Sequence, residues 1–331
     1  MATIPTLFLS DRDVGSLHSW TDAVAALRAA YAAPIGAHMV PPRSMARGDG
    51  VWLRGLSAIS PNGGHMGSKL IAASPRARCA SYLVSLFDQE TMALAALIDG
   101  NQITAIRTAA TAAMAVDALA PAGPLRVAVI GAGFEARSQL LALQAVRPIA
   151  SAAVYSPTSA SRQRYADEFR QRYGIAIVAA ETPQQALDSA DVVLCAARSR
   201  DESPVLLGAW LQPGMTVVSI GSTLPEQREV DVDVIRRAAL IVADMADEVA
   251  HDTGDMLAAT AEGVGFGGKL HALADVIAQR SPVRRAPGDI VLYKSVGSAL
   301  QDVVTAEMLL RRARTAGVGT ILQATIEPVR K

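Results

Sequence analysis

The sequence predicts an α/β protein, in which a doubly wound parallel sheet is joined to a smaller domain of the α+β type. Three observations support this fold class. From Leu125 onward, short β-branched runs alternate with helical stretches, a glycine turn follows the first of these runs, and before Leu125 the runs follow a different order. Alternating strands and helices are typical of a parallel sheet that carries helices on both faces.

The amino-acid composition narrows the range of functions that this protein can have. The chain has 331 residues, 50% of them hydrophobic, and its 31 basic residues balance 31 acidic ones. This balance gives no reason to expect nucleic acid or a membrane surface as partner, so we expect a small molecule. Without a basic, apolar leader at its start, the chain is expected in the cytoplasm. Its two cysteines, Cys79 and Cys195, lack metal-ligand spacing, and no metal is predicted.

The N-terminal part reads as an α+β domain. A helix over 21–33 precedes loop-rich sequence, and "ASYLVSLFD" and "TMALAALID" then predict an antiparallel hairpin that turns near Gln89. The alanine-rich stretch 105–120 predicts a helix, and "APAGP" after it is a natural linker. A last helix over 297–316 has no strand after it and is expected to return to the first domain. The predicted domains are therefore residues 1–120 with 298–331, and residues 121–297.

The second predicted domain contains the strands that alternate with helices. The runs "LRVAVI", "SAAVYS" and "IAIV" alternate with helical stretches, and "ADVVLCA", "MTVVSIG" and "AALIVAD" follow. The stretch "RVAVIGAGFEARSQL" places Gly131, Gly133 and Ala136 in a G-x-G-x-x-A pattern between a buried strand and a helix. Gly131 permits the tight turn, Gly133 leaves room for a pyrophosphate, and Ala136 lets helix and strand approach. The pattern in this context predicts a Rossmann-type dinucleotide site.

The end of the second strand bears on the choice of dinucleotide. NAD-specific sheets usually carry an acid there for the ribose hydroxyls, whereas "VYSPTSASR" has Ser156 at that place. Ser156 and Thr158 can donate to a 2′-phosphate and Arg162 can pair with it, which favours NADP over NAD, although NAD stays possible. A solvated loop arginine is the alternative for Arg162.

One arginine, Arg107, stands near the start of the alanine-rich helix "AIRTAATAAMAVDALA". A buried guanidinium is costly unless an anion meets it, so burial of Arg107 would require an anionic partner. The alternative is an arginine on an exposed stripe of the helix.

Four stretches, "PPRSMAR", "MGSKL", "AIRTAATAA" and "LYKSVGSALQD", surround the nucleotide motif in an order that resembles the ornithine cyclodeaminase and mu-crystallin family. The resemblance implies a homodimer, in which the first domain binds the substrate and builds the dimer interface. It implies that Arg43, Lys69 and Arg107 hold a substrate carboxylate and that Ser295 and Gly297 lie near the nicotinamide.

The sequence departs from the cyclodeaminases in one loop. They carry an aspartate that holds or deprotonates the substrate amine, and here the matching position in "SIGSTLPEQREVD" is Thr223. A threonine hydroxyl orients a nitrogen or a water but is no base near neutral pH. Glu226, Glu229 and Asp231 nearby are interpreted as solvated charges or a helix cap. His65 is either a proton donor or a structural loop histidine.

The resemblance and this departure together favour NAD(P)H-dependent reduction of an imine or ketimine next to a carboxylate, with Lys69, Arg107 and Thr223 as catalytic candidates. The substrate is then a small carboxylate-bearing imine or amino acid. Two alternatives stay open: a cyclase of the ornithine cyclodeaminase type, and a cofactor-dependent binding protein without turnover.

Overall fold

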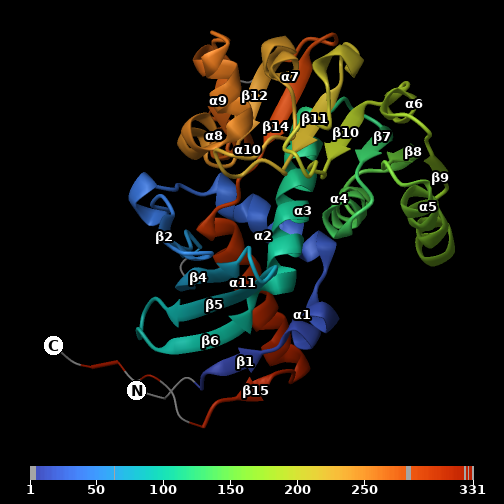
Figure 1. Cartoon of the computed structure of the whole chain (residues 1–331). Coiled ribbons are helices and arrows are strands. Elements are labelled where there is room, and N and C mark those ends of the chain that lie inside the picture. Colours follow the sequence, from blue (N-terminus) through green and yellow to red (C-terminus); the bar gives the residue numbers. More distant parts are fainter. Residues whose placement is uncertain (1–4, 63, 281–284, 324–325, 327, 330–331) are drawn as a thin grey trace. The chain divides into compact units, whose positions relative to one another are not determined.

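The structure is a computed structural model that describes residues 5–62, 64–280, 285–323, 326 and 328–329. Within these residues the chain forms two compact units (Figure 1). The first unit draws on Met1–Thr108 and Ser298–Lys331, and the second on Ala109–Gly297. The boundary falls inside one helix, α3 (Gly100–Leu119), which is longer at its start than the predicted 105–120.

The first unit is built on a seven-stranded sheet in the order β15-β1-β6-β5-β4-β3-β2. β1 and β6 are parallel, and every other neighbouring pair is antiparallel. The strands are β1 (Leu7–Leu9), β2 (Ser44–Gly48), β3 (Val51–Ile59), β4 (His65–Ser74), β5 (Cys79–Asp88), β6 (Leu94–Asp99) and β15 (Thr320–Ile321). The predicted hairpin is present as β5 and β6.

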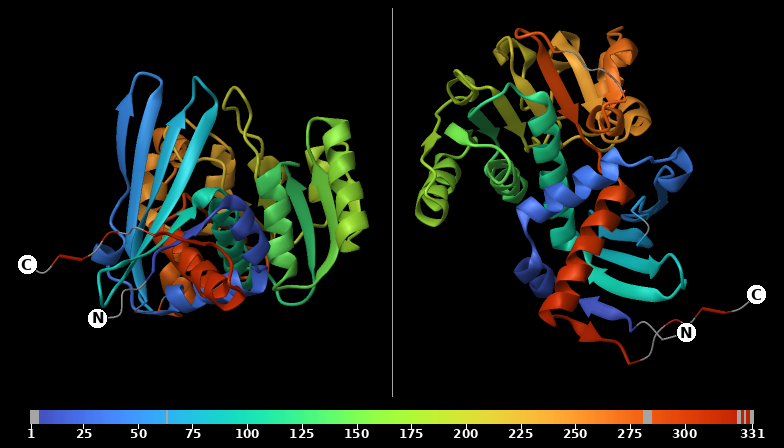
Figure 2. Two further views of the ribbon diagram at one scale, coloured as in Figure 1. Left: turned by 90° about the horizontal axis from the view of Figure 1, so that it is seen from below. Right: turned by 180° about the vertical axis from the view of Figure 1, so that it is seen from behind.

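This unit also contains α1 (Asp11–Leu17), α2 (Trp20–Ala32) and α11 (Ala299–Ala316), as well as the first part of α3. The first predicted helix matches α2, and the last matches α11. Helix α11 packs across β3, β4 and β5 (Figure 2). Most of its side chains are buried. It ends at Gly317, whose φ of 65° is a left-handed conformation that glycine adopts without strain.

Two predictions for this unit were wrong, and one helix was not predicted. The sequence between α2 and the hairpin, expected to be rich in loops, contains the long strands β2, β3 and β4. Many of their residues are glycine, alanine and serine, which weaken the alternation of apolar and polar residues. Helix α1 was not predicted, although Ser10 and Asp13 form a capping box at its start. A short strand, β15, does follow the last helix and pairs with β1.

The second unit contains an eight-stranded sheet in the order β13-β12-β14-β11-β10-β7-β8-β9, and all of its pairs are parallel. The strands are β7 (Leu125–Ile130), β8 (Ile149–Tyr155), β9 (Ile177–Ala179), β10 (Val192–Cys195), β11 (Thr216–Ser219), β12 (Ala238–Ala243), β13 (Leu270–Ala272) and β14 (Ile290–Lys294). The strand order reverses between β7 and β10. In open parallel sheets, ligands bind at the carboxyl ends of the strands at such a point.

Helices cover both faces of this sheet, as predicted for a doubly wound fold. Figure 1 shows α4 and α5 on one side of β7, β8 and β9, and α6 on the other. The helices are α4 (Phe134–Gln144), α5 (Ser159–Tyr173), α6 (Pro183–Leu187), α7 (Val232–Arg237), α8 (Ala246–Asp252), α9 (Gly254–Ala261) and α10 (Leu273–Ile277). Among the described residues, no helix has both the length and the apolar character that crossing a bilayer requires.

Candidate active site

Lys69 lies in the interior of the first unit. It stands in β4 opposite Leu56 of β3 and Val84 of β5, on the sheet face that α11 covers, and 1% of its side chain is exposed. Its Nζ donates to Thr104 Oγ1 at 2.7 Å and to Asp302 Oδ1 at 2.9 Å. An ammonium group that is buried to this degree needs such partners.

Arg107 meets the same carboxylate from α3. It follows Thr104 by three residues, so one helix turn separates the two side chains. Its Nε lies 3.4 Å from Asp302 Oδ1, and its Nη1 donates to Gln301 Oε1 at 3.1 Å. The buried Asp302 of α11 therefore joins Lys69 to Arg107, and the anion that Arg107 meets here is a carboxylate of its own chain.

Arg43, the third residue of the expected carboxylate site, directly precedes β2. The register pairs Ser44 with Gly55 in β3, and Leu56 with Lys69 in β4. Continued by one residue, this register sets Arg43 opposite Leu56 and therefore in line with Lys69. Side chains opposite one another on neighbouring strands share a face of the sheet.

His65 begins β4 and is held by Glu307 of α11. Glu307 Oε1 accepts from the His65 backbone N–H at 2.8 Å and lies 3.1 Å from His65 Nδ1, while its Oε2 accepts from Ser60 Oγ at 2.7 Å. The ring of His65 is thus oriented by a buried carboxylate. These contacts support the structural interpretation of His65 more directly than a role as proton donor.

The glycine turn after β7 has the form that a dinucleotide site requires. Gly131 has a φ of 111°, and a Cβ atom there would lie 2.7 Å from the carbonyl oxygen of Ala196. Gly133 is the exposed N-cap of α4, and a Cβ on it would meet no atom within 4 Å. The open space at Gly133 and the N-terminus of α4 fit a pyrophosphate. Ala136 is fully buried under the turn, as predicted.

The three residues predicted to select the cofactor gather at the end of β8. Arg162 of α5 donates from Nη1 to the carbonyl oxygen of Ser156 at 3.1 Å. Thr158 is the exposed residue that precedes α5. The structure thus brings Ser156, Thr158 and Arg162 together on one short turn.

The loop after β14, which contains Ser295 and Gly297, is fixed by a carboxylate that sequence reasoning missed. Asp244, which follows β12, accepts from Ser295 Oγ at 2.6 Å, from Val296 N–H at 3.0 Å and from Gly297 N–H at 2.9 Å. Gly297 has a φ of 81°, which favours glycine. In the sequence, the acid that ends the run "AALIVAD" is the feature that could have indicated this contact.

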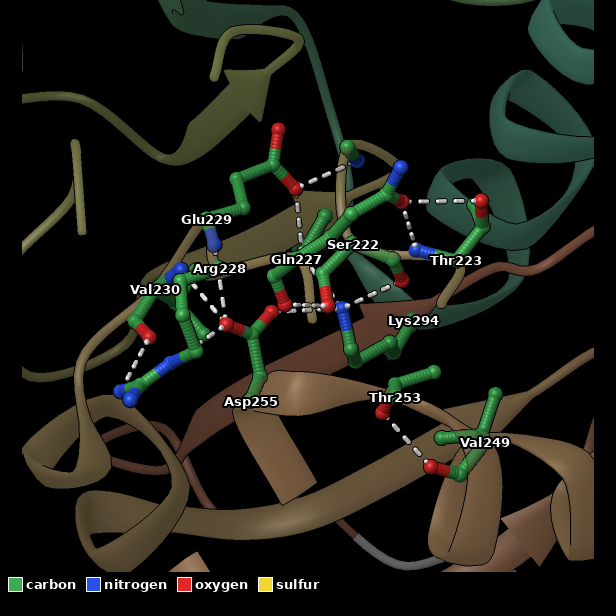
Figure 3. Close-up of polar contacts among 12 residues, drawn as sticks. Ser222, Thr223, Gln227, Arg228, Glu229, Val230, Val249, Thr253, Asp255 and Lys294 are labelled. Atoms are coloured by element: carbon green, nitrogen blue, oxygen red, sulfur yellow. Dashed lines mark hydrogen bonds and ion pairs between the residues drawn. The ribbon is translucent and has the colours of Figure 1, made fainter. Parts of the chain in front are cut away.

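Thr223 lies in the loop after β11 and is held by a side chain of the same loop. Its Oγ1 and its backbone N–H lie 3.2 Å and 3.0 Å from Gln227 Oε1, to which both donate (Figure 3). Gln227 therefore fixes the orientation of the Thr223 hydroxyl. Such a hydroxyl can orient a bound group but cannot accept a proton near neutral pH.

The acids that follow Thr223 differ from one another. Asp231 caps α7 by accepting from Val234 N–H, and Glu226 is exposed, so the interpretation of these two was correct. For Glu229 it was wrong, because that carboxyl group is fully buried and accepts from Ser219 Oγ and from the backbone of Gly221 and Ala197. Because Glu229 is enclosed in this way, it does not replace the missing aspartate.

Comparison with known proteins identifies a family and several relatives. The model of the ornithine cyclodeaminase/mu-crystallin family matches residues 6–317. The delta(1)-pyrroline-2-carboxylate reductase of Bacillus cereus is 28% identical over 242 residues, which cover 73% of this chain and 74% of that protein.

Two solved structures are also similar. The Thermococcus litoralis delta(1)-pyrroline-2-carboxylate reductase in complex with NADH and L-proline superposes with a TM-score of 0.87 at 27% identity, covering 96% of this chain and 100% of that one. An archaeal alanine dehydrogenase dimer with bound NAD gives a TM-score of 0.86 at 26% identity, covering 96% and 99%.

Proposed function

From the membership of this chain in the ornithine cyclodeaminase/mu-crystallin family, we propose that it reduces a C=N bond next to a carboxylate with hydride from NAD(P)H and yields an amino or imino acid. The observation that carries the proposal is the pair of cations on Asp302, together with a glycine turn suited to a dinucleotide. The similar Thermococcus litoralis protein, which covers 96% of this chain, is a reductase of pyrroline-2-carboxylate, a cyclic imine that carries a carboxylate.

The residues of the first unit support an anionic substrate. Lys69, Arg107 and Asp302 together carry one net positive charge, which a substrate carboxylate would balance. Asp302 keeps the two cations close despite their mutual repulsion, and Arg43 directly precedes β2 of the same sheet. A guanidinium offers a carboxylate two parallel hydrogen bonds, which fixes the orientation of the substrate as well as its affinity.

The residues of the second unit support a nicotinamide dinucleotide. Gly131, Gly133 and the start of α4 would hold the pyrophosphate, and the loop of Ser295 and Gly297 would lie at the nicotinamide. When bound, the reduced nicotinamide supplies the hydride. We further propose a preference for NADP, because Ser156 replaces the ribose-binding acid and Arg162 lies on the same turn.

We also propose that the working form is a homodimer. The sheet face of the first unit that points away from α11 carries exposed apolar side chains, among them Leu53, Leu70 and Leu83. A contiguous apolar face of this kind is typical of a surface that a second copy covers.

The test of the proposed reaction is a panel of substrates. The protein is mixed with NADPH or NADH and with cyclic ketimine acids, or with 2-oxo acids plus ammonia or methylamine, and the loss of nicotinamide absorbance is followed. We expect turnover of at least one imino acid and none of its decarboxylated analogue. Binding of cofactor without turnover of any member of the panel would favour a carrier role, and would contradict the proposal.

A further inference from the structure

A buried chain of polar contacts runs below the carboxyl ends of β11 and β14 (Figure 3). Lys294, Asp255 and Glu229 are fully buried. Lys294 Nζ lies 2.8 Å from Asp255 Oδ2 and donates to Ser219 Oγ at 3.0 Å, and Ser219 Oγ donates to Glu229 Oε2 at 2.6 Å. The hydrogen bonds therefore run in one direction, from the ammonium group of Lys294 through Ser219 to the carboxylate of Glu229.

Glu229 connects two loops. Its Oε1 accepts from the backbone N–H of Ala197, in the loop after β10, at 3.2 Å. Its Oε2 accepts from the backbone N–H of Gly221, in the loop after β11, at 2.8 Å. Both loops lie at the carboxyl edge of the parallel sheet, on the β10 side of the point where the strand order reverses.

The loop after β11 packs closely on Glu229 and on the loop after β10, and the loop after β10 packs closely on the glycine turn. A Cβ on Gly221 would lie 2.5 Å from Glu229 Oε1 and 3.0 Å from the carbonyl oxygen of Ala197. A Cβ on Gly131 would lie 2.7 Å from the carbonyl oxygen of Ala196. A displacement of the Glu229 carboxylate therefore has to move the loop that borders the dinucleotide turn.

We propose that Glu229 is a positioning residue whose ionised carboxylate holds the loops after β10 and β11 in the arrangement that receives the nicotinamide half of the cofactor, and whose protonation loosens them. This inference rests on the proposed use of a nicotinamide dinucleotide. The pyrophosphate at the turn after β7 divides the cofactor, so that one half extends toward β8 and the other toward β10 and β11.

The hydrogen bonds of Glu229 explain why its charge matters. Ser219, Gly221 and Ala197 all donate to this carboxylate. Hydrogen bonds to an ionised acceptor are roughly twice as strong as those to a neutral one. Protonation of Glu229 would therefore weaken its contacts to both loops.

Burial, more than the surrounding charges, determines the pKa of Glu229. Burial raises the pKa of Glu229 to about 7, against the lowering effects of Lys294, Ser219 and Gly221. Asp255 of α9, itself 3.4 Å from Arg228, adds a raising effect. Burial and the charge of Glu229 raise the pKa of the Cys195 thiol in β10, so that the thiol remains uncharged.

The test measures the dissociation constant of NADH from about pH 5.5 to about pH 8.5 in the full chain. NADH is the probe because it lacks the 2′-phosphate, a group that itself titrates near pH 6. We expect the dissociation constant to rise about tenfold as the pH falls through the pKa of Glu229, the factor that one charge-assisted hydrogen bond supplies. The Glu229→Gln variant should bind NADH about tenfold more weakly than the unmodified protein at the highest pH, and its NADH affinity should no longer depend on pH.

The matched control is Glu226→Gln, which makes the same change at an exposed position of the same loop and should keep the profile of the unmodified protein. Ser219→Ala keeps the carboxylate but removes a donor that lowers its pKa, so the midpoint should move to higher pH. If the Glu229→Gln variant does not fold, the shift of the midpoint in Ser219→Ala tests the positioning role of Glu229 by itself.

An unchanged pH profile in Glu229→Gln, or an unmoved midpoint in Ser219→Ala, would overturn the positioning role. Failure of the proposed reaction is distinguishable, because it would appear as absent turnover with an intact pH profile of NADH binding. Absence of NADH binding at every pH would remove the premise of both proposals.

Discussion

Asp302 gives Lys69 and Arg107 a shared counter-charge inside the protein. One carboxylate oxygen lies within 3.4 Å of both the buried ammonium group of Lys69 and the largely buried guanidinium of Arg107, and its attraction to both cations offsets their mutual repulsion. Removing one partner of such a group leaves an uncompensated buried charge, which typically costs about 3–5 kcal/mol. The arrangement is therefore sensitive to any change in its charge.

Arg107→Ala should leave cofactor binding nearly unchanged and reduce turnover of every accepted substrate by about a hundredfold or more. A charged contact to the substrate carboxylate contributes about 1.5–3 kcal/mol, and misorientation of the substrate adds to the loss. Steady-state kinetics on the best imino acid and NADPH titration measure both effects. Arg170→Ala, at a side chain that is 63% exposed, is the control. Turnover equal to that of the control would contradict the assignment of Arg107.

Because position 223 carries a threonine and not an aspartate, we expect the protein to be a poor cyclodeaminase. Oxidation of a diamino acid needs a neutral amine, and a hydroxyl held by Gln227 cannot take the proton. Incubation with ornithine or lysine and oxidised cofactor should release little ammonia and form little proline or pipecolate. Thr223→Asp should raise this activity, since it restores an acid at that place. Rapid cyclisation by the unmodified protein would show that Thr223 is not the limiting residue.

At the residue scale, the sequence predicts the roles that depend on local pattern. The glycine turn, the cap at Asp231 and the need of Arg107 for an anion were all visible within a few positions of each residue. The identities of Asp302, Asp244 and Glu307 as partners were not, because each lies far along the chain from the group that it holds. Glu229 and Asp231 look alike in the sequence, and only the fold separates the buried acid from the cap.

At the element scale, the turn between β8 and α5 is the segment that we propose selects the cofactor. Ser156 ends the strand region, Thr158 precedes the helix, and Arg162 reaches back from its first turn to the Ser156 carbonyl oxygen. A phosphate group bound here would meet hydroxyl and guanidinium donors together with the N-terminus of α5. A ribose hydroxyl would find no acid at position 156.

Ser156→Asp should shift the preference from NADPH toward NADH. The new carboxylate would repel a 2′-phosphate and accept from the ribose hydroxyls, and we expect the ratio of the two dissociation constants to change by about tenfold or more. Titration with both nucleotides measures the ratio. Ser156→Asn, which has the same size without the charge, is the matched control. Equal affinities of the unmodified protein for both nucleotides would argue against the proposed preference.

The strands β2, β3 and β4 show why part of this fold was not predicted. Their alternation is present in the structure, where Arg54 and Ala58 are buried and Leu53 and Ile59 are exposed. Apolar residues stand on the outer face as well as the inner one, however, so the pattern of apolar and polar residues fades. In contrast, the parallel strands of the second unit are buried on both faces and read as continuous apolar runs.

At the scale of the whole molecule, the same outer face suggests a contact between copies. Leu53, Leu70 and Leu83 lie on neighbouring strands and are 48%, 40% and 38% exposed. A charged residue among them would have to be buried on association. Apolar anchors near the centre of an interface supply most of its binding energy.

Leu70→Asp should therefore convert a dimer into a monomer, or weaken it by at least about thirtyfold, the factor that corresponds to one central anchor. Light scattering coupled to size-exclusion chromatography measures the mass in solution. Val178→Asp, which changes a 58% exposed apolar residue of β9 in the same way, should leave the mass unchanged. A monomeric unmodified protein, or a Leu70→Asp variant that stays dimeric, would contradict the assignment of this face.

The first unit is built from two stretches of the chain that are synthesised at different times, before and after the second unit. Lys69 and Arg107 leave the ribosome early, but Asp302, which neutralises them, belongs to a helix that is translated only after the second unit. At about 5–20 residues per second, synthesis of the stretch 109–297 takes roughly ten to forty seconds. During that interval the nascent first unit lacks the acid that its buried cations require, so we expect it to mature only when α11 is released and docks.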